Sequence, residues 1–237
     1  MLDLTANCSE KLVSAEEAVS KIKRGSRVFI GTGCGEPQHL IRAMVNDTRL
    51  QDIMVYQMLS STLAQYIDDP SFTRRFSIKL FFISRTMRKA AFEGKIDYIP
   101  TYLSQIPRLF SSQRIGLDVA LIQVSPPDKY GYCSLGVSVD ITKSGMENAH
   151  LVIAQVNPKM PRTWGDSFVH VDEIDYLVVK EEPLVEALPG SKNDEIAIAS
   201  FNEPIISKIR VLEEIEPLCA KFSPKNNVKA STGIRLQ

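Results

Sequence analysis

Three short runs of almost wholly apolar residues constrain the fold of this chain more than any other feature of its sequence. The runs are Leu117–Val124 (LDVALIQV), Leu151–Val156 (LVIAQV) and Tyr176–Val179 (YLVV). A strand that is buried on both faces reads in this way, which is typical of the central strands of a parallel sheet. The sequence therefore predicts a parallel sheet with helices covering both of its faces.

Strand-like and helix-like segments alternate along the first 180 residues. Further strands are expected at Arg27–Ile30, Ile53–Met58 and Ile78–Ile83. Helices are expected from the Ser14 capping box to Gly25, after Pro37, and over Thr86–Phe92, Tyr102–Phe110 (with a break at Pro107) and Thr142–Ala149. This alternation favours the α/β class, with an open and mostly parallel sheet.

Composition divides the chain into three parts. We expect an α/β domain over residues 1–180, then a linker over residues 181–195, where acidic residues and prolines replace apolar periodicity. Residues 196–237 are expected to hold one helix, over Glu203–Phe222, and a lead-in strand at the end, Ser231–Gln237. We interpret this last part as the start of a second domain.

Charge and cysteine usage exclude several classes of protein. The chain has 28 Lys and Arg against 28 Asp and Glu, so it offers no net charge to nucleic acid or to an anionic membrane. No apolar stretch approaches the roughly 18 residues that span a bilayer, and no secretory signal is visible. The four cysteines are far apart and form no C-x-x-C pair, which favours a cytoplasmic protein without a zinc site.

A glycine-rich loop, Gly31–Pro37 (GTGCGEP), lies between an expected strand and an expected helix. A dinucleotide fingerprint is disfavoured, because Glu36 stands where its third glycine would be. Two readings remain open at this point. The loop is either a tight structural turn, or backbone N–H groups at the start of the helix form an anion or oxyanion site.

Two further loops follow buried strands, where ligands of open α/β sheets bind. They are Ser125–Gly136 and Gln155–Ser167, and each is either a wall of the site or a rigid surface loop. Asn157 and Thr163 offer hydrogen bonds to a carboxylate, and Met160 offers an adaptable apolar contact. The residues that we expect to contact substrate are Glu36, Pro37, Ser125, Pro126, Gly131, Ser134, Asn157, Met160, Pro161, Thr163 and Gly165.

The amino-acid sequence of these loops resembles that of one known family. GLDVALIQVSPPDKYGYCSLGVSVD and VIAQVNPKMPRTWGDSFVHVDEIDYLVV are similar to the N-terminal half of the acetyl-CoA hydrolase/transferase family, and GCGEPQHLIRAMV resembles its glycine loop and first helix. The resemblance covers roughly residues 10–185. It implies an open α/β domain of the coenzyme A transferase type, no bound cofactor, and a CoA thioester as substrate.

The resemblance also implies covalent catalysis by a glutamate that lies in a second domain. Its carboxylate attacks the acyl-CoA thioester, and a glutamyl-CoA intermediate then passes CoA to an acceptor carboxylate. Carried over to this chain, the family's glycine loop puts the backbone N–H of Cys34 at the oxyanion position, with Gly33 and Gly35 shaping the turn. The Cys34 side chain is then not a nucleophile, although a reactive thiol is the rival reading.

The chain departs from the family in one respect. The glycine-rich G-I-G-x-I-P type motif that precedes the family's nucleophilic glutamate is absent from these 237 residues. We therefore expect the chain alone to be inactive and to need a second domain or a partner subunit that carries the glutamate. Its expected partners are an acyl-CoA, a short-chain carboxylate and further copies of itself, with no nucleic acid and no membrane. The alternatives are an acyl-CoA hydrolase and a non-catalytic scaffold subunit.

Overall fold

The computed structural model describes residues 9–186 of the 237-residue chain. The expected helix over Glu203–Phe222 and the expected strand over Ser231–Gln237 lie outside the described residues. Within residues 9–186, no helix is long and apolar enough to cross a bilayer. The α-helices and strands, in chain order, are α1 (Ala15–Val19), β1 (Arg27–Ile30), α2 (Gln38–Asn46), β2 (Ile53–Gln57), α3 (Pro70–Arg75), β3 (Phe76–Leu80), α4 (Arg88–Phe92), β4 (Ile96–Tyr98), α5 (Ile106–Ser111), β5 (Leu117–Val124), β6 (Tyr132–Ser134), α6 (Thr142–Glu147), β7 (Ala149–Val156), β8 (Phe168–His170) and β9 (Tyr176–Val179).

Seven of the strands form one open sheet in the order β4-β3-β2-β1-β5-β7-β9, and every neighbouring pair is parallel. The expected α/β class with a mostly parallel sheet is confirmed. Strands β1 to β4 run outward in chain order on one side of β1, and β5 then returns to the other side of β1. The order of the strands therefore reverses between β1 and β5, where Val28 lies beside Val119.

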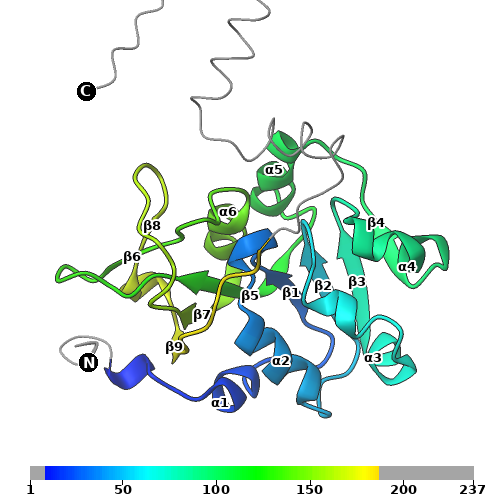
Figure 1. Ribbon diagram of the computed structural model, residues 1–237, viewed down its shortest axis with the longest axis horizontal. Coiled ribbons are helices and arrows are strands. Elements are labelled where there is room, and N and C mark those ends of the chain that lie inside the picture. The colour runs from blue at the N-terminus through cyan, green and yellow to red at the C-terminus, as the bar shows by residue number, and fades with distance from the viewer. Residues whose placement is uncertain (1–8, 187–237) are drawn as a thin grey trace, which may run out of the picture. The chain divides into compact units, whose positions relative to one another are not determined.

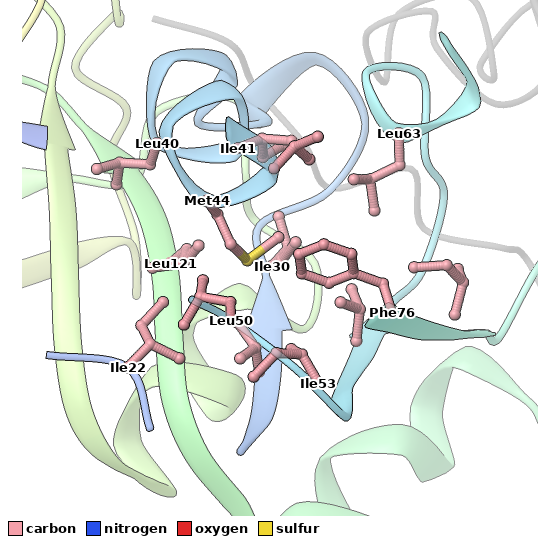
Figure 2. Close-up of a cluster of buried hydrophobic side chains, with 14 of the residues drawn as sticks. Ile22, Ile30, Leu40, Ile41, Met44, Leu50, Ile53, Leu63, Phe76 and Leu121 are labelled. Carbon is pink, nitrogen blue, oxygen red and sulfur yellow. The ribbon is translucent and has the colours of Figure 1, made fainter. Parts of the chain in front are cut away.

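Apolar side chains pack on both faces of the sheet. Figure 1 shows α1 and α2 on one side of the strands and α5 and α6 on the other. On the first side, Leu40, Ile41 and Met44 of α2 belong to one apolar cluster with Ile30, and Met44 points toward Ile30 (Figure 2). On the other side, Phe29 meets the ring of Phe110 edge-on, with 5.7 Å between the ring centres. Burial on both faces explains why the central strands are apolar at nearly every position.

A second, two-stranded sheet was not expected from the sequence. Strands β6 and β8 pair antiparallel, with Cys133 opposite Val169. Strand β6 lies in the loop Ser125–Gly136 and β8 directly follows the loop Gln155–Ser167, so their pairing joins these two segments. Strand β4, at the edge of the main sheet, was also not expected, because only Ile96 of its three residues is buried.

The helices are shorter than their apolar spacing predicts. The side chain of Ser14 accepts a hydrogen bond from the Glu17 N–H, as expected, but α1 ends at Val19 and not near Gly25. The Ser20 hydroxyl bonds back to the Glu17 carbonyl, which competes with continuation of the helix. The expected helix over Tyr102–Phe110 is divided into a 3₁₀ turn and α5, because Pro107 fits only the first turn of a helix.

Candidate active site

The glycine loop lies where the order of the strands reverses. It follows β1, and the loops after β5 and β7 leave the same edge of the sheet, because these strands are parallel. In open α/β sheets, ligands bind outside the carboxyl ends of the strands at such a point. The structure thus brings the three loops that the sequence indicated to one edge of the sheet.

The glycine loop forms a single 3₁₀ turn over Gly33–Gly35. Gly33 has φ +61°, a conformation that side chains rarely adopt, and a Cβ added to it would meet no atom within 4 Å. Gly35 is required for a different reason, because a Cβ there would lie 1.7 Å from the Ser138 hydroxyl oxygen. The glycines therefore give the turn its backbone conformation and let the loop around Ser138 close over it.

Cys34, between these glycines, is exposed. The N–H groups of Gly33, Gly35 and Glu36 donate to backbone carbonyls, whereas the N–H of Cys34 donates to no acceptor in the described part of the chain. Neither does its thiol hydrogen-bond to any of those residues. The turn thus contains an exposed residue whose backbone donor has no acceptor within residues 9–186.

The N-terminus of α2 is already occupied by the chain's own side chains. The His39 N–H donates to Gln155 Oε1 at 3.1 Å and to Glu182 Oε1 at 3.0 Å, and the Gln38 N–H donates to the Glu36 carbonyl. Glu182 also pairs with Arg42. The helix start is therefore not an open anion site, whereas the Cys34 N–H in the preceding turn has no acceptor among residues 9–186. Because Glu182 packs here, the start of the expected linker lies against the domain.

The side chain of Glu36 points inward, with none of its surface exposed. Its carboxylate accepts hydrogen bonds from Gln57 Nε2, the Ser61 N–H, the Thr62 N–H and the Thr62 hydroxyl, over 2.6–3.1 Å. Burial raises the pKa of the Glu36 carboxyl, and the four donors oppose that rise. Pro37, which precedes α2, is buried as well.

The loop after β5 is held by its own hydroxyls. Ser125 and Ser134 are buried, and Ser125 Oγ accepts from the Ser134 N–H at 2.9 Å. Pro126 is half-buried, and its carbonyl accepts from Ser125 Oγ. Gly131 has φ +85° and closes a turn against His170 of β8. The expected contacts of these residues with substrate stay predictions.

The loop after β7 uses its polar side chains within the protein. Asn157 is fully buried, and its Nδ2 donates to Gln123 Oε1 and to the Glu182 carbonyl. Met160 is buried against Gly136, and Thr163 Oγ1 donates to the carbonyl of Gly136. Pro161 and Gly165 are exposed. In this structure the loop therefore presents Pro161, Trp164 and Gly165 to the outside, while Asn157 and Met160 face inward.

Arg162 joins the two long loops. Its guanidinium donates to the carbonyls of Pro126 and Tyr132 and to the carboxylate of Asp128, over 3.0–3.1 Å. These bonds add to the pairing of β6 with β8, so the two loops form one unit. No group of three or more His, Cys, Asp and Glu side chains suited to a metal ion occurs among residues 9–186.

Three glutamines at strand ends belong to this region and were missed by the sequence reasoning. Gln57 ends β2, and Gln123 and Gln155 lie one residue before the ends of β5 and β7, where they are register partners. All three are buried, with 0–1% of their surface exposed. The sequence carried a signal, because each is an uncharged polar residue at or next to the end of a strand and follows a run of mostly apolar residues.

Comparison with known proteins agrees with this arrangement. Residues 3–189 match the acetyl-CoA hydrolase/transferase N-terminal domain. The chain is 46% identical over 186 residues to 4-hydroxybutyrate coenzyme A transferase of Clostridium kluyveri, which covers 78% of this chain and 43% of the relative. It is 36% identical over 179 residues to succinyl-CoA:acetate/propanoyl-CoA:succinate CoA transferase of Fasciola hepatica, covering 74% and 37%.

Solved structures show the same likeness. The crystal structure of RipA from Yersinia pestis superposes with a TM-score of 0.72 at 31% identity, over 80% of this chain and 46% of that one. The chain thus spans less than half the length of each of these three relatives.

Proposed function

This chain belongs to the acetyl-CoA hydrolase/transferase family, and from that premise we propose that it supplies the N-terminal domain of a CoA-transferase. The reaction moves CoA between a short-chain acyl-CoA and a carboxylic acid. Both relatives described above are CoA-transferases, which supports this reaction class. Because the chain spans under half of their length, the complete activity belongs to this domain together with a second domain or a partner subunit.

The proposed reaction proceeds through covalent intermediates. A glutamate carboxylate of the second domain attacks the thioester carbonyl, and CoA thiolate leaves to give an acyl-glutamyl anhydride. The thiolate then attacks the glutamyl carbonyl, which releases the carboxylate product and leaves a glutamyl-CoA thioester. An acceptor carboxylate attacks that thioester and displaces CoA thiolate, which gives a new anhydride. The thiolate finally attacks the acceptor-derived carbonyl of this anhydride, which forms the new acyl-CoA and releases the glutamate carboxylate.

The observation that carries this proposal is the unused N–H of Cys34. Each step passes through a tetrahedral oxyanion, which needs a donor that is in place before charge develops. Cys34 is an exposed residue, its N–H is free of internal acceptors within residues 9–186, and the loop lies where ligands of this kind of sheet bind. No cofactor is required, since the CoA thioester is itself the substrate.

The test separates the backbone of Cys34 from its side chain. In a version of the protein that contains the second domain, Cys34→Ala keeps the N–H and is expected to keep most activity with acetyl-CoA or butyryl-CoA and a carboxylate acceptor. Cys34→Pro removes the N–H and is expected to lower kcat by about 10²–10³. Thermal unfolding checks that both variants are folded.

Two outcomes would contradict the proposal. If Cys34→Ala abolishes turnover in a folded protein, the thiol takes part in the chemistry. If Cys34→Pro is folded and fully active, the oxyanion donor lies elsewhere. The same assay without an acceptor measures hydrolysis, and hydrolysis faster than transfer would favour an acyl-CoA hydrolase.

A further inference from the structure

The glycine loop forms several hydrogen bonds to a neighbouring segment, Gln57–Thr62, which we call the anchor segment. The Thr32 hydroxyl donates to the Leu59 carbonyl at 3.0 Å and accepts from the Leu59 N–H at 2.8 Å. The Gly33 N–H donates to the same carbonyl. These bonds hold the first half of the glycine loop against the anchor segment.

Glu36 bonds the second half of the loop to the same segment. Its Oε1 accepts from Gln57 Nε2 at 3.1 Å and from the Ser61 N–H at 2.7 Å. Its Oε2 accepts from the Thr62 N–H at 2.8 Å and from the Thr62 hydroxyl at 2.6 Å. Every bond to this carboxylate therefore comes from the anchor segment.

The backbone at both ends of the glycine loop is also fixed. Gln57 Nε2 donates to the Gly31 carbonyl at 3.0 Å, and Gln123 Nε2 donates to the Glu36 carbonyl at 3.2 Å. Gln123 is held in turn by Gln155 and Asn157, which both donate to its Oε1 at 3.0 Å. The loop is thus fixed before and after Cys34, while the N–H of Cys34 itself stays unused.

Full burial of the Glu36 carboxylate is energetically unfavourable. Glu36 forms no ion pair with a Lys or Arg of the described residues, and burying a charge without a partner is unfavourable unless hydrogen bonds compensate it. An apolar side chain of similar size would avoid that cost. What an apolar side chain would not do is accept from two consecutive backbone N–H groups and so fix the path of the anchor segment.

We propose that Glu36 is a positioning residue, whose buried carboxylate clamps the anchor segment to the glycine loop and so holds the Cys34 N–H in one orientation. The proposal rests on the proposed function only in one respect, the role of that N–H as the oxyanion donor. The clamp itself is a property of this chain and is measurable in the 237-residue protein.

The experiment measures the order of the Cys34 backbone amide by ¹⁵N relaxation. In the unsubstituted protein we expect an order parameter of about 0.85, as in rigid backbone. In Glu36→Gln, whichever way the new amide faces, its NH₂ opposes the N–H of Ser61 or of Thr62. We therefore expect the order parameter of Cys34 to fall toward about 0.6, the range of flexible backbone. Thr62→Val, a near-isosteric change that removes one of the four donors, is expected to give a smaller fall.

The matched control is Asp118→Asn. Asp118 pairs with Arg27 where β5 and β1 begin, at the other end of these strands from the glycine loop. Its substitution is therefore expected to lower the unfolding temperature without loosening Cys34. Either variant, Glu36→Gln or Thr62→Val, tests the proposal as long as it is folded. If the order parameter of the Cys34 amide is unchanged in the folded variant, the proposal is overturned. An equal fall in Asp118→Asn also overturns it, because Glu36 would then act only through general stability.

The two proposals fail separately. If the order parameters change as expected and Cys34→Pro nevertheless leaves turnover intact, the proposed role of the Cys34 N–H is rejected and the clamp remains. If turnover depends on the N–H but Glu36→Gln leaves it ordered, the clamp alone is rejected.

Discussion

Gly35 and Ser138 are expected to be strongly coupled in stability. A Cβ on Gly35 would lie 1.7 Å from Ser138 Oγ and 3.0 Å from Ser138 Cβ, and Ser138 is 2% exposed, so its hydroxyl has no room to move away. Overpacking of this kind costs about 1–3 kcal/mol, which we expect for Gly35→Ala. Ser138→Ala alone is expected to change stability by less than about 1 kcal/mol, because Ser138 Oγ has no hydrogen-bond partner among the described residues.

The double variant Gly35→Ala/Ser138→Ala is expected to recover most of the loss. Without the hydroxyl, the nearest atom to the new Cβ is Ser138 Cβ at 3.0 Å, which a small shift relieves. The coupling energy should therefore be about 1–2 kcal/mol, within the range for contacting residues. The assay is urea unfolding of the unsubstituted protein, the two single variants and the double variant. An m-value that is the same for all four shows that only stability has changed.

Gly33→Ala is the matched control for this cycle. It costs about 1–2 kcal/mol through the left-handed conformation of Gly33 alone, because no atom lies near its Cβ position. Ser138→Ala should not rescue it. The reasoning is refuted if Gly35→Ala and Ser138→Ala add to within about 0.5 kcal/mol, or if Ser138→Ala rescues Gly33→Ala equally.

Three further predictions concern activity, the loop after β7 and pH. The 237-residue chain alone should turn over acetyl-CoA with acetate far more slowly than the ~1–10³ per second of ordinary enzymes, because the proposed nucleophile lies elsewhere; a coupled assay at ordinary rates would contradict this. Met160→Ala should lower the free energy of unfolding by about 2–5 kcal/mol, because Met160 is 3% exposed and packs on Gly136; a loss below about 1 kcal/mol in urea would show that the side chain is not in the core. Burial raises the pKa of Glu36 above its ordinary value of 4.5, so the folded state binds this proton at pH values where the unfolded chain has released it. The free energy of unfolding should therefore fall, relative to that of Glu36→Gln, as the pH rises from 4.5 through the raised pKa; a difference between the two proteins that is independent of pH would contradict the assigned shift.

The central strands could be predicted from the sequence because burial on both faces leaves an unmistakable pattern. Leu117–Val124 and Tyr176–Val179 are strands with the expected bounds. Strand β4 could not be predicted, since an edge strand of three residues with one buried side chain has no periodicity to detect. The pairing of β6 with β8 depends on contacts between distant segments, which local patterns do not encode.

The location of the candidate site was predictable, but the direction of its side chains was not. A glycine loop after a strand indicates where ligands bind, and the structure places Gly33–Gly35 there. Whether the start of α2 is open depends on Gln155 and Glu182, more than 100 residues away in the sequence. The inward direction of Asn157 likewise follows from its bonds to Gln123 and Glu182, which the loop sequence alone does not reveal.

The seam between β1 and β5 has a consequence for how this protein acquires its site during folding. Strands β1 to β4 pair with neighbours that are close in the chain, as do β5 to β9, whereas β1 and β5 join Val28 to Val119 across everything between them. Contacts of such long sequence separation carry the largest loop-closure cost and form slowly. The glycine loop stands on this seam, and Gln123 reaches it from β5. Neither half of the sheet thus contains the complete candidate site, and a chain emerging from the ribosome gains it only after β5 has paired with β1.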